Sequence, residues 1–333
     1  MNVLVTGAAG FIGENLVYRL AESGAVVHAF CYTPEEARTL IHPKIKTFLG
    51  DVLDKERIGI AMAGCQQVYH LAAFAKVWVK DIRVIHDINV TGTLNVLDKA
   101  KELGVDKVVV TSSAGVIGPS RKQNVTENSE PWIDYSTEYE RSKAIMEEKT
   151  RKYAREGLNV VIVNPTRVYG PGLLSESNSV TRIVIKYMRG KWYFIPGDGG
   201  KIGNYAFIDD VVNGYVSAME KGRSGERYIL GGENRSYNEL FECIRNISGK
   251  QYRLYNVPYV LMITIARIQM IYTLLSQKSP KITPGLIRKY QFNWNTSCGK
   301  AERELGYKIT AFESGIQKTI DWINKNHLAT IGS

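Results

Sequence analysis

The N-terminal segment MNVLVTGAAGFIG constrains the fold of this chain more than any other part of the sequence. A short apolar run at 2–6 leads into glycines at positions 7, 10 and 13, and apolar residues then recur at 12, 16, 17 and 20. Strand, glycine turn and helix in this order place free N–H groups and the positive end of a helix dipole where a pyrophosphate can bind. Gly7 permits the tight turn, Gly10 lets the backbone approach the phosphates, and Gly13 allows the helix to pack closely on the strand. An ordinary helix start can use the same residues, but the position directly after a first strand favours a dinucleotide site.

The first half of the chain alternates strand-like and helix-like segments, as a βαβ fold requires. Runs such as KVVVT at 107–111 and NVVIV at 159–163 are apolar on both faces, which is typical of buried parallel strands. The pattern predicts an α/β fold, a Rossmann-type doubly wound parallel sheet, over residues 1–165. We expect residues 166–333 to form mainly a smaller substrate-binding lobe, with some segments returning to the first domain. The predicted strands are 2–6, 26–31, 45–49, 67–71, 106–112 and 159–164, and the clearest predicted helices are 54–63, 84–103 and 137–156.

The composition, with 44% hydrophobic and 23% charged residues, is that of an ordinary soluble globular protein. The net charge of +10 indicates either a solvated basic surface or an anionic ligand, and no recognised nucleic-acid-binding module accompanies it. The four cysteines share no C-x-x-C spacing, so we predict reduced thiols, no metal site and a cytoplasmic location.

The apolar stretch from Val257 to Leu275 is the best candidate for a membrane segment. Arg267 and Gln269 interrupt it, and its unbroken apolar part is too short to span a bilayer. We therefore interpret it as a buried or groove-lining helix and expect no transmembrane segment, with a role at a membrane surface as the less favoured alternative.

Tyr139 and Lys143 lie four residues apart in a predicted helix, so both face the same side. A phenol has a reference pKa of about 10, which is too high for efficient acid–base chemistry at neutral pH. A neighbouring lysine ammonium lowers that pKa by stabilising the phenolate. The pair is therefore a candidate to pass a proton to or from a carbonyl or alcohol oxygen, although Y-x-x-x-K alone is common by chance.

Other polar or small residues follow the predicted strands, at the sheet edge where open parallel sheets bind ligands. The segment TSSAG, which contains Ser112 and Ser113, follows the fifth strand and can supply a hydroxyl that orients a substrate oxygen. Asp51 follows the third strand and can accept a hydrogen bond from an adenine amino group. The segment HLAA at 70–73 follows the fourth strand, where small residues let a ribose pass close to the backbone.

These segments, taken in order along the chain, resemble the extended short-chain dehydrogenase/reductase family. Within that family the chain is most similar to the dihydroflavonol-reductase-like branch, which includes bacterial proteins described as hopanoid-associated sugar epimerases. The segments GERYILGGEN at 225–234 and TSSAG carry the second likeness. The family resemblance rests on TGAAGFIG (6–13), GDVLD (50–54), HLAA (70–73), NVTGT (89–93), TSSAG (111–115), YERSK (139–143), NPTRVYGPG (164–172), YAFIDDVV (205–212) and LGY (305–307).

The resemblance implies a catalytic trio of Ser113, Tyr139 and Lys143, with Tyr139 as the acid–base. It also implies that Lys143 holds the nicotinamide ribose, that Asn89 supports the lysine and nearby backbone, and that Pro165 packs beside the nicotinamide. Family members often dimerise through two long helices, here near 84–103 and 137–156, so a homodimer is expected. The full set of predicted cofactor-binding residues is Gly7, Gly10, Phe11, Ile12, Gly13, Asp51, Val52, Leu71, Ala72, Ala73, Asn89, Tyr139, Lys143 and Pro165.

Two positions depart from the nucleotide-sugar members that the chain resembles. Those members usually carry Asn before the V-Y-G-P segment, where this chain has Arg167. They also usually carry an Arg that grips the diphosphate, where this chain has Gly203 and Asn204. Arg167 is open to two interpretations, a contact to an anionic substrate or a structural ion pair.

We therefore predict an NAD(P)-dependent oxidoreductase that reduces a small-molecule ketone, or oxidises the alcohol, by hydride transfer. A nucleotide-sugar epimerase or dehydratase with the same Ser-Tyr-Lys site is the first alternative, and a non-catalytic dinucleotide sensor is the second. NADP(H) is favoured over NAD(H), because Cys31 stands at the end of the second strand where NAD enzymes place an acidic residue. No carboxylate is then expected to repel a 2′-phosphate, while Glu35 and Glu36 come several residues later.

Overall fold

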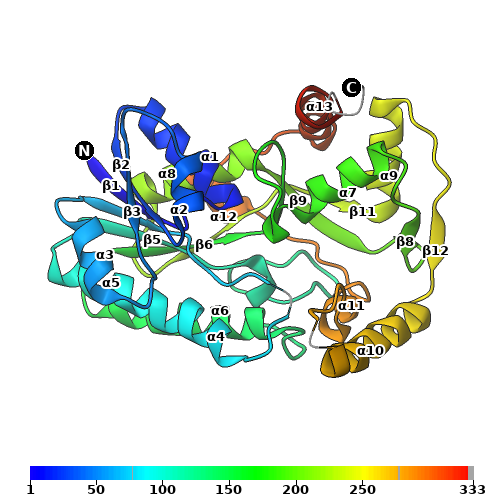
Figure 1. Ribbon diagram of the computed structural model, residues 1–333, viewed down its shortest axis with the longest axis horizontal. Coiled ribbons are helices and arrows are strands. Elements are labelled where there is room, and N and C mark those ends of the chain that lie inside the picture. The colour runs from blue at the N-terminus through cyan, green and yellow to red at the C-terminus, as the bar shows by residue number, and fades with distance from the viewer. Residues whose placement is uncertain (77, 277, 329–333) are drawn as a thin grey trace.

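A seven-stranded sheet in which every pairing is parallel forms the left half of the molecule (Figure 1). The computed structural model describes residues 1–76, 78–276 and 278–328. The strand order is β10-β6-β5-β4-β1-β2-β3. The strands are β1 (Asn2–Thr6), β2 (Val26–Cys31), β3 (Ile45–Leu49), β4 (Gln67–His70), β5 (Lys107–Thr111), β6 (Val160–Pro165) and β10 (Arg227–Leu230).

The direction of winding reverses between β1 and β4. The chain builds outward from β1 through β2 to β3, then returns to the other side of β1 and builds β4, β5 and β6. Ligands of open α/β sheets bind outside the carboxyl ends of the strands at such a reversal. The predicted α/β fold with a Rossmann-type doubly wound parallel sheet is confirmed, and the predicted strand limits agree with the structure to within one residue.

Helices cover both faces of this sheet. Helix α1 (Phe11–Glu22) packs against α8 (Ile208–Lys221) on one face, while α3 (Lys55–Met62), α5 (Gly92–Glu102) and α6 (Glu138–Arg155) pack together on the other. The helix predicted at 84–103 consists of α4 (Arg83–His86), a π-helical turn at Asp87–Thr91 and α5. The remaining helices around the sheet are α2 (Pro34–Thr39) and α12 (Gly299–Leu305).

Most of the later part of the chain forms the right half of the molecule (Figure 1). It contains a three-stranded sheet, β11-β9-β7, and a two-stranded sheet, β12-β8. Strand β10 and helix α12 return from this part of the chain to the large sheet. The elements are β7 (Arg167–Tyr169), β8 (Phe194–Pro196), β9 (Ile202–Phe207), β11 (Glu233–Ser236), β12 (Tyr255–Val257), α7 (Ser179–Met188), α9 (Tyr237–Ser248), α10 (Tyr259–Ser276), α11 (Pro284–Lys289) and α13 (Phe312–Ile323).

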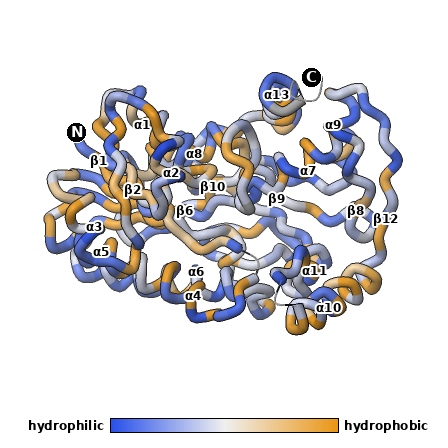
Figure 2. Tube along the Cα trace, viewed as in Figure 1, coloured by the Kyte–Doolittle hydropathy of each residue, from blue (hydrophilic) through white to orange (hydrophobic). Residues whose placement is uncertain are grey.

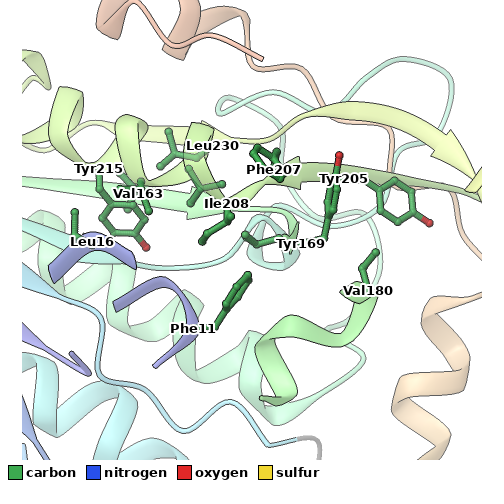
Figure 3. Packing of buried hydrophobic residues seen from close by; sticks show 14 of the residues in the cluster. Phe11, Leu16, Val163, Tyr169, Val180, Tyr205, Phe207, Ile208, Tyr215 and Leu230 are labelled. Atoms are coloured by element: carbon green, nitrogen blue, oxygen red, sulfur yellow. The ribbon is translucent and has the colours of Figure 1, made fainter. Parts of the chain in front are cut away.

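The larger hydrophobic core is continuous between the two halves. Figure 3 shows Phe11, from the first turn of α1, pointing toward Tyr169 of β7 and Ile208 of α8. The same cluster includes Val163 in the large sheet and Tyr205 in β9. The two parts are therefore packed together, since apolar side chains from both fill one interior.

Helix α10 differs from the sequence interpretation. The alternative that 257–275 is a buried helix is wrong for most of its length, because only Met262, Ala266 and Thr273 are buried. The groove-lining alternative holds for its first turn, where Tyr259 and Met262 line a pocket. Figure 2 shows the helix as a largely apolar segment at the lower edge of the molecule. Among the described residues it is the one helix that is long and apolar enough to cross a membrane, judged by length and composition alone. Its residues are apolar on all sides, so the sequence pattern could not indicate which face is covered.

Candidate functional site

The glycine turn between β1 and α1 is shaped by two close backbone approaches. Gly7 has φ +65°, and a Cβ on it would lie 2.7 Å from the backbone nitrogen of Ala72. A Cβ on Gly13 would lie 2.1 Å from the carbonyl oxygen of Gly7. The roles predicted for these two glycines agree with this geometry, since any side chain would separate the helix from the strand.

Gly10 lies at the N-terminal end of α1, where there is free space beside its Cα. It is the N-cap of that helix, no side chain caps the first turn, and a Cβ on it would meet only the Gly7 carbonyl, at 3.2 Å. The first N–H groups of the helix therefore point outward without a side-chain acceptor in the described structure. This arrangement fits the diphosphate of a dinucleotide, which needs such donors and a close backbone.

The segment after β4 lies directly on this turn. The Ala72 N–H donates to Thr6 Oγ1 over 3.2 Å, and Thr6 contacts His70 Nδ1 at 2.7 Å. His70 Nε2 lies 2.9 Å from Thr93 Oγ1, whose own hydroxyl donates to the Asn89 carbonyl. His70 is therefore a neutral, buried link between β1, β4 and the helix region at 83–102, and burial lowers its pKa to about 3.

The predicted catalytic residues lie at the carboxyl ends of the strands. Ser113 follows β5 and caps a short 3₁₀ turn through its hydroxyl, which accepts the Gly115 N–H over 3.1 Å. Tyr139 and Lys143 lie in the first two turns of α6, which begins with a capping box formed by Thr137 and Glu140. The Lys143 Nζ donates to the Thr111 carbonyl over 2.7 Å, so the helix is held against the end of β5.

Burial dominates the protonation of this pair. It raises the pKa of Tyr139 to about 12, with a further contribution from the Glu140 carboxylate. It lowers the pKa of Lys143 to about 8, against the opposing effect of Glu147. The expected lowering of the Tyr139 pKa by Lys143 is not found in this structure. The ammonium is bonded to a backbone carbonyl instead, with Lys143 buried and Tyr139 partly buried.

Asn89 connects the N-terminal part of α6 to the segment after β4. Its side-chain oxygen accepts the Phe74 N–H over 2.7 Å, and its amide nitrogen donates to Ser142 Oγ over 2.9 Å. Asn89 lies within the π-helical turn and is fully buried. It therefore contacts the backbone and the neighbour of Lys143 rather than the lysine itself.

A second positioning network was not predicted from the sequence. Asn164, in β6, donates to the Ser113 carbonyl over 3.0 Å and to Glu147 Oε1 over 2.6 Å. Glu147 is buried and pairs with Arg227 and Arg151 at 3.2 and 2.8 Å. The network ties the Ser113 backbone to α6 and β10. The i, i+4 spacing of Lys143 and Glu147 was the available signal, whereas the link to Asn164 joins residues far apart in the chain.

Asp51 and Glu36 follow β3 and β2, the two strands at one end of the large sheet. Asp51 follows β3, and its side chain accepts the Leu53 N–H over 2.9 Å. Glu36 was expected several residues beyond the end of β2, but its carboxylate turns back and accepts the Tyr32 N–H over 2.8 Å. The expectation that no carboxylate lies at the end of β2 is therefore wrong, because α2 begins immediately after the strand and returns Glu36 to it.

Arg167 lies in an aromatic environment. Its Nη1 donates to Tyr237 Oη over 3.0 Å and to Tyr205 Oη over 3.4 Å, and the guanidinium lies 5.5 and 5.7 Å from the centres of the same two rings. Within the part of the chain that the structure describes, no carboxylate pairs with it. Of the two interpretations of Arg167, the structural ion pair is therefore excluded within the described residues.

The neighbouring positions Gly203 and Asn204 are occupied by structural contacts. A Cβ on Gly203 would lie 2.6 Å from Arg167 Nη1, so the guanidinium fills that space. Asn204 is buried, and its amide nitrogen donates to the Gly232 carbonyl over 2.7 Å and to Asn234 Oδ1 over 2.9 Å. Neither residue presents a free donor to a ligand.

A family model described as "NAD dependent epimerase/dehydratase family" matches residues 3–231. The chain belongs to the NAD-dependent epimerase/dehydratase family. It is an enzyme of the extended short-chain dehydrogenase/reductase type, as the order of its motifs predicted.

Relatives and solved structures of this family cover nearly the whole chain. Sterol demethylase protein B of Methylococcus capsulatus is 30% identical, over 98% of this chain and 99% of its own. A putative dihydroflavonol 4-reductase of Synechocystis is 28% identical, over 97% and 94%. The structure of UDP-glucuronic acid 4-epimerase from Bacillus cereus, in complex with UDP-glucuronic acid and NAD, matches with a TM-score of 0.78 and 26% identity, over 98% and 99%.

The buried neutral His70 makes stability depend on pH. Its folded-state pKa of about 3 lies below the unfolded value of about 6.5, so the unfolded chain binds the extra proton between these values. Stability should therefore fall as the pH drops below about 6.5, by about 2 kcal/mol between pH 7 and pH 5 from this residue. Urea unfolding at the two pH values should show a smaller difference for His70→Gln. An unchanged difference in the variant would contradict the assignment.

Proposed function

We propose that the protein is an NAD(P)-dependent oxidoreductase that reduces a ketone to an alcohol, or oxidises the alcohol, with net hydride transfer. Ser113, Tyr139 and Lys143 form its catalytic trio. The substrate is a small molecule that carries an anionic group, and Arg167 binds that group. The observation that carries the substrate class is the guanidinium of Arg167, which has aromatic hydroxyl partners but no carboxylate partner in the described chain.

Several features support net oxidoreduction over nucleotide-sugar epimerisation. The Arg that nucleotide-sugar members usually carry for the diphosphate is replaced here by Gly203 and Asn204, and Asn204 is engaged with Gly232 and Asn234. A diphosphate with too few paired donors is costly to bury. The two relatives described above are named as a sterol demethylase protein and a putative reductase, which agrees with this ranking. The epimerase remains the second candidate, because a nucleotide-sugar epimerase structure matches along nearly the full chain.

Each residue of the trio would have its own role in the reaction. Tyr139 is protonated at neutral pH because burial raises its pKa to about 12, and it would donate that proton to the developing alkoxide. The same high pKa makes the phenol a weak acid until a bound cofactor and substrate compensate the phenolate charge. Ser113 orients the substrate oxygen, and its own position is held by Asn164. Lys143, held at the Thr111 carbonyl, would orient the ribose of the cofactor. The nicotinamide supplies or accepts the hydride when bound.

The glycine turn would hold the diphosphate of the cofactor. Gly7, Gly10, Phe11, Ile12 and Gly13 supply the close backbone and the helix N–H groups. The other residues proposed to contact the dinucleotide are Asp51, Val52, Leu71, Ala72, Ala73, Asn89, Tyr139, Lys143 and Pro165.

Removal of the phenol hydroxyl tests the catalytic assignment. Tyr139→Phe should lower turnover by about 10²–10⁴-fold, the usual range for loss of a general acid, and leave cofactor affinity nearly unchanged. Lys143→Ala should reduce both turnover and cofactor affinity. Tyr193→Phe, at an exposed tyrosine, is the matched control and should behave as the wild type. Steady-state rates and cofactor titration measure both quantities. Most of the activity surviving in Tyr139→Phe would show that the trio is misassigned, and cofactor binding without turnover by the wild type would favour a sensor.

The substrate class is tested at Arg167. Ring ketones that carry a carboxylate should be reduced with net consumption of NAD(P)H, and Arg167→Met should lower kcat/KM for them by about 10–100-fold, the effect of losing a charged hydrogen bond. The methyl esters of the same ketones are the control, since the variant should process them as the wild type does. Calorimetry with UDP- and dTDP-sugars should detect only weak binding and no epimerised product. Micromolar affinity with product formation would reverse the ranking of the two enzyme functions.

The preference for NADP(H) over NAD(H) is proposed from Cys31 and the basic excess of the chain, and the Glu36 carboxylate opposes it. Parallel titrations of NADPH and NADH measure the ratio, and tighter NADH binding by the wild type would contradict the preference. Glu36→Gln should shift the ratio toward NADPH by about two- to fivefold, the effect of removing one partly exposed like charge. Glu35→Gln removes the same charge on the exposed side of α2 and should leave the ratio unchanged.

Two expectations from the sequence stay predictions. A cytoplasmic location is one. A homodimer formed through the helices at 83–102 and 138–155 is the other, and the measured mass in solution tests it.

A further inference from the structure

Helix α10 has an apolar face that no other described part of the chain covers. Met262 and Ala266 pack with Ile287 of α11 in a small separate cluster, and these contacts hold one side of the helix. The opposite side carries large apolar side chains in water, among them Ile271, which is 59% exposed, and Leu274, which is 79% exposed. The others are Val260, Leu261, Ile265, Ile268, Tyr272 and Leu275. A contiguous exposed apolar surface of this kind marks an interaction site.

The charge of the surrounding chain identifies the kind of partner. Residues 243–301 contain nine Lys or Arg and no Asp or Glu, so this segment accounts for nine of the ten net positive charges of the protein. Arg267, Lys278 and Lys281 are exposed beside or within the helix. Lys281 lies next to the middle of α10, because its backbone N–H donates to Gln269 Oε1 over 3.0 Å. An apolar helix surrounded by basic side chains is complementary to a surface that is both apolar and anionic.

We propose that α10 docks on the surface of a membrane that contains anionic lipids, with its outer face in the headgroup region and the flanking bases against the phosphates. The helix lies on the bilayer and does not span it. Its packing on α11 and the bonds from Gln269 to the chain at 281 and 282 keep it attached to the protein body. Arg267 lies exposed near its middle, a position that a spanning helix would bury in hydrocarbon.

A second copy of the chain fits this face less well. A symmetric contact through α10 would bring two basic segments together, and like charges oppose such an interface.

A pocket beside the helix is consistent with a membrane on this side of the molecule. Tyr259 and Met262, from the first turn of α10, line a pocket of about 630 Å³ together with Tyr290. Docking would therefore place the mouth of this pocket close to the lipid.

Vesicle binding by the full chain tests the proposal without any assay of turnover. The wild type should sediment with vesicles of phosphatidylcholine and phosphatidylglycerol at low ionic strength, and less with pure phosphatidylcholine or at high salt. Ile271→Gln combined with Leu274→Gln should weaken binding by about tenfold or more, since two large apolar side chains are removed from the lipid. Lys278→Gln combined with Lys281→Gln should weaken binding to the anionic vesicles only.

A matched control is available elsewhere on the surface. Ile41 and Ile60 are 81% and 59% exposed, and Ile41→Gln combined with Ile60→Gln should bind vesicles as the wild type does. NADH titration on every variant verifies folding independently of the proposed reaction. Failure of the wild type to bind anionic vesicles, or equal binding by the α10 variant, would overturn the proposal. So would a dimer that the α10 variant dissociates, or resistance of the bound protein to alkaline carbonate extraction, which indicates a spanning helix.

Discussion

The close contact of three backbone segments at the start of the chain determines where everything else in the site lies. The Gly7 carbonyl lies against Gly13 in α1, and Gly7 itself lies against the backbone of Ala72 after β4. No side chain fits at either glycine, so helix, turn and loop meet without a gap. This contact fixes the direction of α1, whose free N–H groups then face the sheet edge at which the winding reverses. The large sheet carries this contact at its edge, and hydrophobic clusters pack on both faces of the sheet.

A second rigid element, α6, is held at the same edge by buried polar groups rather than by apolar packing alone. Lys143 reaches the Thr111 carbonyl, Asn89 reaches Ser142, and Glu147 reaches Asn164. Burying such groups is costly unless they are paired, and these three bonds fix where α6 lies against the strand ends, although Asn164 Oδ1 has no hydrogen-bond partner in the described structure. The phenol of Tyr139 and the hydroxyl of Ser113 consequently have defined positions before any ligand binds, which is the condition for efficient acid–base chemistry.

The sequence predicted what depends on local patterns. Glycine spacing, two-sided apolar strands and the four-residue spacing of Tyr139 and Lys143 are short-range signals, and they led to the correct fold and family. The network of Asn164 and Glu147 was not predicted, because it joins residues that only the folded sheet brings together. The return of Glu36 to the end of β2 depends on how soon α2 begins after the strand. The absence of a carboxylate beside Arg167 in the described structure is also a tertiary property, since the sequence offers many acidic residues that might have paired with it.

Helix α10 shows the limit of hydrophobicity as a guide to burial. Its apolar residues predicted a buried or groove-lining helix, yet among the described residues the hydrophobic cluster that it joins is small and separate from the main cores. Exposed side chains of this size bury little surface within the chain, and a contiguous apolar patch of them marks an interaction site, which is the basis of the proposed membrane contact. The same part of the protein carries Arg167, which has no carboxylate partner among the described residues, and Tyr290 connects the two features. It lines the pocket beside α10 and lies 5.8 Å, ring centre to ring centre, from the Tyr237 that contacts Arg167. Tyr290 therefore lies between the pocket beside α10 and the aromatic pair that contacts Arg167, so the exposed apolar helix and the half-buried cation belong to neighbouring parts of one lobe.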